Sequence, residues 1–362
     1  MWRKELKTNI RTIDELKKYI RLTKLEENQF KNIVKYHPMN ITKHYLSLID
    51  FEDPDDPLKK MVIPSLEEMN LSGSYDTSDE KSSTILSGLQ HKYPQTALIL
   101  ATNICASYCR FCFRKRLVGL SSREVVKNFE HATDYIKQHE EINNVLITGG
   151  DPLMLRTEVI RGFLEELENI EHLNFIRFGT KVPVFLPNRI LKDDELLKLF
   201  RNYNKQIYLV MQIDHPKEIT SELKRAVKKL LRTGVIINNQ TVLLKGVNDK
   251  PEILANLQSK LISIGINPYY VFQCRPVKRV KRSFQLSLFK GLKIVEEAKT
   301  MMSGHGKRFK YIMSHKTGKI EIIGILDDEI YFKYHQAKNP KNYGKFFKRK
   351  LIKSAGWLDE LH

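Results

Sequence analysis

The sequence predicts an α/β fold in which buried parallel strands alternate with helices. Short runs rich in apolar and β-branched residues recur from residue 97 onward, roughly 30 to 50 residues apart, which suits the length of a βαβ unit. Segments with helical periodicity lie between these runs. The predicted strands cover residues 97–102, 144–149, 175–180, 207–213, 235–244 and 268–274.

Six such units fit either a partial (β/α) barrel or an open doubly wound sheet, and periodicity alone does not choose between the two. In both architectures ligands bind at the carboxyl ends of the parallel strands. We therefore expect the functional residues in the loops that follow the strands. The helical segments between them are predicted at residues 124–139, 158–170, 193–202 and 221–233.

Two segments of different character flank the predicted barrel, which we place at residues 91–300. Residues 1–90 read as a mainly helical extension, with amphipathic stretches such as 26–36. Residues 301–362 read as a C-terminal segment. Its tail, residues 341–353, interleaves basic with aromatic side chains.

The composition favours a cytoplasmic globular protein. Of 362 residues, 41% are hydrophobic, which allows a full core. No run approaches the ~20 apolar residues of a membrane span, and the charged N-terminus lacks a secretory signal. The net charge of +19 fits polyanion binding or a generally lysine-rich composition. We favour the second, and expect the basic tail to be a solvated amphipathic terminus rather than a nucleic-acid site.

Four cysteines are present, and three of them, Cys105, Cys109 and Cys112, fall within eight residues directly after the first predicted strand. Such clustering does not suit a disulfide scaffold. Three thiolates on a compact loop can hold three irons of a cubane [4Fe–4S] cluster and leave the fourth iron open. Structural zinc normally takes four protein ligands, and Cys274, the remaining cysteine, follows another strand. The cluster is favoured over zinc or free thiols.

The Cys-x3-Cys-x2-Cys spacing, with Phe111 before the last cysteine, resembles the radical S-adenosylmethionine superfamily. In that superfamily the open iron is chelated by the amino and carboxylate groups of S-adenosylmethionine, and an electron from the cluster cleaves the sulfonium to give a 5′-deoxyadenosyl radical. Thr148-Gly149-Gly150-Asp151, at the end of the next strand, resembles the superfamily's Gly-Gly-Glu/Asp element. The backbone of that element receives the amino group of the cofactor.

Several further segments together resemble the lysine 2,3-aminomutase family, over roughly residues 85–320. The resemblance implies a partial (β/α)6 barrel of the radical S-adenosylmethionine type and an isomerase that also uses pyridoxal 5′-phosphate. A 2,3-amino shift needs an imine, which supplies the π-bond that an unassisted radical lacks. The matching segments are 91–94, 108–116, 145–151, 176–187, 214–216, 239–249 and 268–274.

The resemblance implies a role for one lysine and one arginine. The family lysine that binds pyridoxal phosphate lies in a glycine-rich turn, and Thr317-Gly318-Lys319-Ile320 aligns with it, which makes Lys319 the candidate and Lys316 its competitor. This turn is shorter and poorer in glycine than the family turn. Arg114 matches the arginine that pairs with the substrate carboxylate, a contact that a guanidinium makes at two points.

Four other positions match family residues near the cofactors. Tyr93 and Gln240 align with positions near the pyridine ring. Arg177 aligns with the region near the adenosyl group, and Gln212 stands there where many relatives have histidine.

Two positions depart from the lysine-specific pattern. Lysine-specific relatives carry an aspartate after the segment 268–274 and another before the glycine-rich turn, and both receive the ammonium group of the substrate side chain. Arg275 and Ser314 stand at these positions. The change reverses the local charge, so we expect an acidic substrate such as glutamate rather than lysine. Lys250 replaces a family cysteine of an intersubunit zinc site, so that site is not expected.

The implied partners are a small amino acid and an electron donor of the flavodoxin or ferredoxin type. A homo-oligomer is possible, whereas membrane and nucleic-acid partners are not expected. Two other functions compete with this reading. One is a radical S-adenosylmethionine enzyme without pyridoxal phosphate, or one that acts on RNA or on a lysyl residue of a translation factor. The other is a non-enzymatic iron–sulfur or zinc RNA-binding module.

Overall fold

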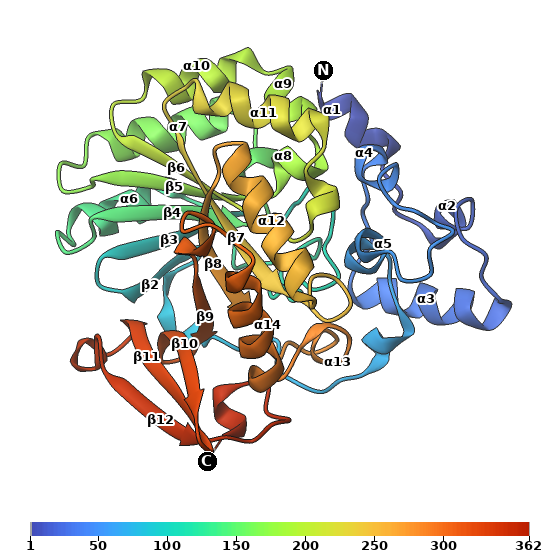
Figure 1. Cartoon of the computed structure of the whole chain (residues 1–362). Coiled ribbons are helices and arrows are strands. Elements are labelled where there is room, and N and C mark those ends of the chain that lie inside the picture. Colours follow the sequence, from blue (N-terminus) through green and yellow to red (C-terminus); the bar gives the residue numbers. More distant parts are fainter. Residues whose placement is uncertain (1, 362) are drawn as a thin grey trace.

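The computed structural model describes residues 2–361, and its centre is one twelve-stranded sheet whose strands follow in chain order (Figure 1). Seven consecutive strands are parallel, and six of them coincide within two residues with the predicted runs. The α/β class is thereby confirmed. The parallel strands are β3 (Thr96–Thr102), β4 (Asn144–Gly149), β5 (Phe175–Thr180), β6 (Gln206–Met211), β7 (Ile236–Leu243), β8 (Asn267–Gln273) and β9 (Lys310–His315).

The sheet curls into a partial barrel. Antiparallel strands extend it at both ends: β1 (Thr84–Leu86) and β2 (Leu89–Tyr93) before β3, and β10 (Gly318–Leu326), β11 (Glu329–Ala337) and β12 (Phe346–Lys350) after β9. The two margins of the parallel strands approach each other. This is seen in a hydrogen bond in which the Nζ of Lys92 on β2, the neighbour of β3, donates to the carbonyl of His315 on β9 at 2.8 Å. A side chain rather than a strand pair bridges this gap. The structure therefore selects the barrel over the open sheet.

Amphipathic helices cover the outer face of the barrel (Figure 1). In one of them, spanning Asp194–Asn202, the carboxylate of Asp193 caps the first turn by accepting the N–H of Leu196 at 3.0 Å. The helices are α6 (Phe129–Lys137), α7 (Thr157–Glu168), α8 (Val182–Phe185), α9 (Asn188–Leu191), α10 (Asp194–Asn202), α11 (Ser221–Leu231), α12 (Pro251–Ser263), α13 (Lys281–Phe284) and α14 (Leu288–Thr300).

The N-terminal part of the chain is helical and packs beside the barrel (Figure 1). Its apolar side chains, from Trp2 to Ile63, belong to the same core as those of the barrel strands. The longest helix begins with a capping box in which Thr23 and Glu26 satisfy each other's backbone N–H groups. The helices are α1 (Trp2–Glu5), α2 (Ile13–Leu16), α3 (Lys24–Tyr36), α4 (Lys43–Leu46) and α5 (Pro57–Val62).

The C-terminal strands form a second core with α14. Trp357 and Leu361, at the end of the chain, are buried in it. The basic tail forms β12, an edge strand whose side chains are mostly exposed. Within residues 2–361, we find no helix with the length and apolarity that a membrane crossing requires.

Candidate active site

One cavity of about 310 Å³ runs from the carboxyl ends of the parallel strands into the barrel. Its lining comes from segments that are more than 200 residues apart in the sequence. All fourteen residues predicted from the sequence line it: Tyr93, Cys105, Cys109, Cys112, Arg114, Thr148, Gly149, Gly150, Asp151, Arg177, Gln212, Gln240, Arg275 and Lys319. The structure therefore brings every predicted site residue to one place.

Residues of the N-terminal segment outside its α-helices hold the cysteine loop in position. The side-chain amide of Asn40 donates to the carbonyls of Cys105 at 3.2 Å and Ala106 at 2.8 Å. The guanidinium of Arg110 forms a buried ion pair with Glu68, with an N–O distance of 2.6 Å. These contacts fix the loop backbone and leave the sulfur atoms facing the cavity.

Burial raises the pKa of Cys105, Cys109 and Cys112 above the ordinary thiol value. A metal binds the thiolate form, so metal binding here must release protons. Near Cys109, the Nζ of Lys181 lies 2.6 Å from Asp214 and 2.8 Å from Glu218. Although burial opposes its charge, these two carboxylates raise the pKa of Lys181, which keeps a cation beside Cys109.

The spacing of the cysteines suits a cluster better than a single ion. Among residues 2–361, the three cysteines are not a group whose sulfur atoms all lie within 4.8 Å of one another. Two sulfur atoms bound to one zinc ion at ~2.3 Å each lie less than about 4.6 Å apart. In this structure the three sulfur atoms are therefore not gathered as closely as a single zinc ion would hold them. In an iron–sulfur cluster, by contrast, each thiolate binds a different iron.

The Gly149-Gly150-Asp151 turn lies against the start of the cysteine loop. Gly149 has a φ of +118°, and a Cβ on Gly150 would lie 2.4 Å from the carbonyl oxygen of Ile104. The N–H of Asp151 donates to that same carbonyl at 2.8 Å. Two glycines are therefore needed for the turn to approach the cysteine loop this closely.

Asp151 joins the end of β4 to the end of β5. Its buried carboxylate accepts hydrogen bonds from the Thr180 hydroxyl at 2.8 Å and from the backbone N–H groups of Lys181 at 2.7 Å and Val182 at 2.9 Å. Burial raises its pKa to about 6 despite these donors. Asp151 thus shapes the cavity floor beside the glycine turn.

Lys319 lies in a cationic and aromatic part of the cavity. Its Nζ is 5.8 Å from the ring centre of Tyr93 and 5.2 Å from that of Tyr270. Burial, reinforced by the positive charges of Arg177, Arg275 and Lys92, lowers its pKa to about 7. Its competitor Lys316 is exposed, pairs with Asp359 at 3.3 Å and lies outside the lining of the cavity.

The polar groups near Lys319 suit an anionic cofactor. Two buried donors, the Nε of Arg177 and the Nε2 of Gln90, have no hydrogen-bond partner within the described chain. The Oε1 of Gln336, an acceptor, is also buried there without a partner. Arg177 donates to Asn144, which begins β4, so its guanidinium lies deep in the barrel. A neutral lysine beside unpartnered donors and cations fits an aldehyde that carries a phosphate, such as pyridoxal phosphate.

Arg275 and Arg114 both face the cavity and both are held by side chains. Arg275 donates to the hydroxyls of Ser78 at 2.7 Å and Ser314 at 2.9 Å. Its guanidinium lies 4.1 Å from the ring centre of Phe113. Arg114 pairs with Glu80 at 3.1 Å. Burial lowers the pKa of Arg275 to about 10, which keeps it cationic at neutral pH.

Gln212 and Gln240 approach the cavity from β6 and β7. The side-chain amide of Gln212 donates to Asp214 at 3.1 Å, in the same acidic group that binds Lys181. Gln240 lies on β7, opposite Tyr270 of β8. Both glutamines therefore line the same cavity as the cysteine loop and Lys319.

Sequence reasoning missed several polar residues of the cavity, among them Ser78, Glu80, Gln90, Lys92 and Gln336. Of these five, Lys92 carried a signal, because it lies in the matched segment 91–94, whereas the other four lie in segments without a motif.

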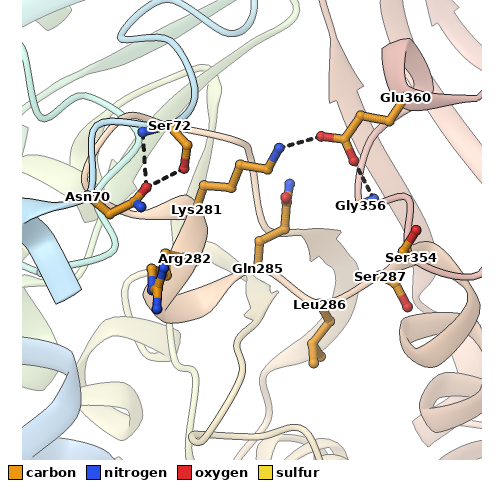
Figure 2. A pocket seen from close by; sticks show the side chains of 10 residues that line it. All are labelled: Asn70, Ser72, Lys281, Arg282, Gln285, Leu286, Ser287, Ser354, Gly356 and Glu360. Carbon is orange, nitrogen blue, oxygen red and sulfur yellow. Dashed lines mark hydrogen bonds and ion pairs between the residues drawn. The ribbon is translucent and has the colours of Figure 1, made fainter.

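A second cavity, of about 340 Å³, lies between α13 and the C-terminus (Figure 2). The Nζ of Lys281 bridges its opening to Glu360, whose other carboxylate oxygen accepts the N–H of Gly356. Within the described chain, none of the predicted site residues lines it, so we assign the chemistry to the first cavity.

Comparison with known proteins agrees with this assignment. The Radical SAM superfamily matches residues 99–257. A relative from Aquifex aeolicus named "Putative L-lysine 2,3-aminomutase" is 41% identical over 97% of this chain and 95% of its own length. The L-lysine 2,3-aminomutase of Clostridium subterminale is 38% identical over 84% and 73% of the two chains. The glutamate 2,3-aminomutase of Clostridioides difficile is 36% identical over 83% and 71%.

Proposed function

Because the chain belongs to the lysine 2,3-aminomutase family of the radical S-adenosylmethionine superfamily, we propose that it converts an acidic α-amino acid, above all glutamate, into the corresponding β-amino acid. As a member of this family it is an isomerase that uses a [4Fe–4S] cluster, S-adenosylmethionine and pyridoxal phosphate. The acidic substrate is the finer proposal, and it depends on the side chains that line the cavity.

The reaction exchanges two groups between adjacent carbons. The amino group moves from C2 to C3, and a hydrogen atom moves from C3 to C2. Substrate and product are therefore isomers, and no net oxidant is consumed. When bound, the cluster and S-adenosylmethionine supply a carbon radical that removes this hydrogen atom, and pyridoxal phosphate supplies the π-bond across which nitrogen moves. The protein must hold three ligands in register and exclude water.

The cavity residues divide this binding work. The three cysteines bind the cluster, and the backbone of Gly149 and Gly150 receives the amino group of S-adenosylmethionine, as their close approach to the cysteine loop supports. Gln212, near the acidic group that binds Lys181, lies toward the adenosyl group. Arg114 pairs with the α-carboxylate of the substrate.

Lys319 binds pyridoxal phosphate covalently, with Tyr93 and Gln240 beside the ring. Its lowered pKa supports this role, because the neutral amine is the reactive form. Although the resemblance aligns Arg177 with the region of the adenosyl group, we propose that it binds pyridoxal phosphate. Its Nε has no hydrogen-bond partner in the described chain, and its positive charge contributes to the lowered pKa of Lys319. There it offers a donor for the phosphate.

The position of Arg275 in the cavity is the observation on which the substrate proposal rests. It lines the cavity near Lys319, and Ser78 and Ser314 hold its guanidinium. Two unit charges 4 Å apart at an effective dielectric near 20 interact by about 4 kcal/mol before desolvation. A substrate carboxylate would gain such an interaction with Arg275, whereas a lysine side chain would face repulsion. Relatives named lysine 2,3-aminomutase and glutamate 2,3-aminomutase have similar identities to this chain, so overall identity favours neither substrate and Arg275 supports the acidic one.

The proposal is tested by anaerobic reconstitution with iron, sulfide and pyridoxal phosphate, followed by an amino-acid panel. Mass spectrometry would score β-amino products from glutamate, aspartate, lysine and neutral amino acids. We expect β-glutamate to form fastest. Turnover of lysine well above that of glutamate would overturn the proposal.

The reaction also needs an electron donor for the cluster. We assign this role to a donor of the flavodoxin or ferredoxin type and place the enzyme in the cytoplasm, where a reducing environment keeps the three cysteines available for iron.

A further inference from the structure

Glu80 is a buried carboxylate of the cavity to which the proposed function gives no role. It is 8% exposed and lies in the segment 74–83, which contacts Lys92 on β2 and Arg275 just after β8. Its two carboxylate oxygens accept from different arginines: Oε1 from Arg114 at 3.1 Å, and Oε2 from Arg116 at 2.8 Å. A carboxylate that faces a substrate-binding arginine is either a competitor or a support, and the hydrogen bonds decide between these roles.

The contacts of Arg114 leave part of its guanidinium free. Glu80 accepts from Nε at 3.3 Å and from Nη2 at 3.1 Å, which occupies the side edge of the group. The hydroxyl of Thr148 accepts from Nη1 at 3.2 Å. A guanidinium has five N–H groups. Two therefore remain without a partner among residues 2–361, one on each terminal nitrogen, and a carboxylate can accept two-point hydrogen bonds from such a pair. Glu80 thus supports Arg114 along the side edge of the guanidinium and leaves two N–H groups for a ligand.

The same segment also holds the second arginine. Ser78, two residues before Glu80, accepts from Nη1 of Arg275 at 2.7 Å, and its carbonyl accepts from Lys92 at 2.9 Å. The segment is anchored at its start, where the N–H of Ser74 donates to the carbonyl of Pro276 at 3.0 Å. It is anchored again at Asp79, which pairs with Lys338 at 3.4 Å. Ser78 and Glu80 therefore occupy fixed places.

We propose that Glu80 and Ser78 are positioning residues that set the separation of two carboxylate sites. Glu80 orients Arg114 toward the α-carboxylate, and Ser78 orients Arg275 toward the side-chain carboxylate. The assignment of the two sites rests on the proposed function. Because one short segment holds both arginines, it selects a dicarboxylic amino acid of defined length.

The test compares Glu80→Gln and Glu80→Asp with Glu124→Gln in the reconstituted holoenzyme. Glu124 is a matched control, because it pairs with Arg116 at 2.7 Å from the exposed side. We expect Glu80→Gln to raise the KM for glutamate about 10-fold or more. This fold-change corresponds to the free energy of about one charge-assisted hydrogen bond. Glu80→Asp should recover part of this loss, and Glu124→Gln should match the wild type.

The α-amide of glutamate separates positioning from general damage. It lacks the α-carboxylate, so the effect of Glu80→Gln on its binding should be small. Iron content, pyridoxal phosphate content and 5′-deoxyadenosine formation should stay at wild-type levels. Two results would overturn the role of Glu80. One is an equal loss of affinity for glutamate and for its α-amide in Glu80→Gln. The other is a Glu80→Asp variant that loads its cofactors and has the wild-type KM for glutamate.

Ser78→Ala tests the second half of the proposal. Its KM should rise for glutamate and not for norvaline, which lacks a side-chain carboxylate, and equal effects on both would overturn the role of Ser78. If lysine proved to be the substrate, Glu80→Gln would still raise the KM for lysine, which has the same α-carboxylate. That pattern would defeat the proposed substrate and the role of Ser78 while retaining the role of Glu80.

Discussion

Covalent loading of pyridoxal phosphate is expected to reach its full rate near neutral pH, because Lys319 has a pKa of about 7. Only the neutral amine attacks an aldehyde. At pH 7.5, roughly three quarters of a group with pKa 7 is neutral, against about one part in a thousand for pKa 10.5. Burial and the charges of Arg177, Arg275 and Lys92 therefore make the lysine reactive without a neighbouring base.

The pH dependence gives the magnitude of this effect. From pH 7.5 to 5.5 the neutral fraction falls about 25-fold for pKa 7, and from pH 7.5 to 9.5 it rises only about 1.3-fold. An ordinary lysine would instead gain about 90-fold over the second interval. The assay mixes cofactor-free protein with pyridoxal phosphate, traps the adduct with borohydride and maps it by peptide mass spectrometry. Lys92→Met should move the midpoint to higher pH, because it removes a nearby cation.

Lys316→Ala is the matched control, since Lys316 is exposed and lies outside the lining of the cavity. It should load like the wild type, whereas Lys319→Ala should yield no adduct at the turn. An adduct on Lys316, or a rate that climbs about 90-fold between pH 7.5 and 9.5, would refute the reasoning.

Three further predictions concern the rest of the cavity. Replacing Cys105, Cys109 and Cys112 together with alanine should abolish cluster absorbance and 5′-deoxyadenosine formation. Cys274→Ala should keep both, because this buried thiol also lines the cavity but follows another strand. A triple variant that still cleaves S-adenosylmethionine would contradict the cluster assignment. Arg275→Asp should lower kcat/KM for glutamate by roughly 100-fold or more, because a buried charge left without its partner costs free energy on that scale. The same variant should give some turnover of lysine. Unchanged glutamate kinetics would place Arg275 outside the substrate site. Asp151→Asn should slow S-adenosylmethionine cleavage at normal iron content, because the carboxylate that accepts hydrogen bonds from Thr180, Lys181 and Val182 becomes a neutral amide. Cleavage at the wild-type rate would show that the Gly149-Gly150-Asp151 turn keeps its function without that charge.

The parallel strands could be predicted because strands buried on both faces are continuous apolar runs. The sequence does not predict β9, since its apolar residues 311–313 form too short a run among polar neighbours, although residues 311–315 are all buried. The segment 341–353 was expected to be a solvated terminus, and its residues Phe346–Lys350 are an exposed edge strand. Strand pairing with β11 decides that outcome, and an edge strand that buries neither face has no alternation of apolar and polar residues to predict it from.

The candidate site was predictable where chemistry demands a spacing. The cysteines and the glycine turn follow strand ends, and Lys319 follows a glycine in a short turn. Glu80 and Ser78 could not be found this way, because they lie in a polar segment without periodicity. Their roles depend on Arg114 and Arg275, which only the folded chain brings to them.

The central claim is that this enzyme moves nitrogen from C2 to C3 of an acidic amino acid, and isotope tracing in a competition tests it most directly. The reconstituted enzyme would receive equal amounts of glutamate and lysine, each labelled with ¹⁵N at the α-amino group and ¹³C at C2 and C3, and NMR would follow the carbon–nitrogen couplings. We predict that the glutamate coupling moves from C2 to C3, while lysine remains mostly unchanged. Transfer of ¹⁵N to C3 of lysine ahead of glutamate, or loss of ¹⁵N from either amino acid as ammonia, would contradict the account.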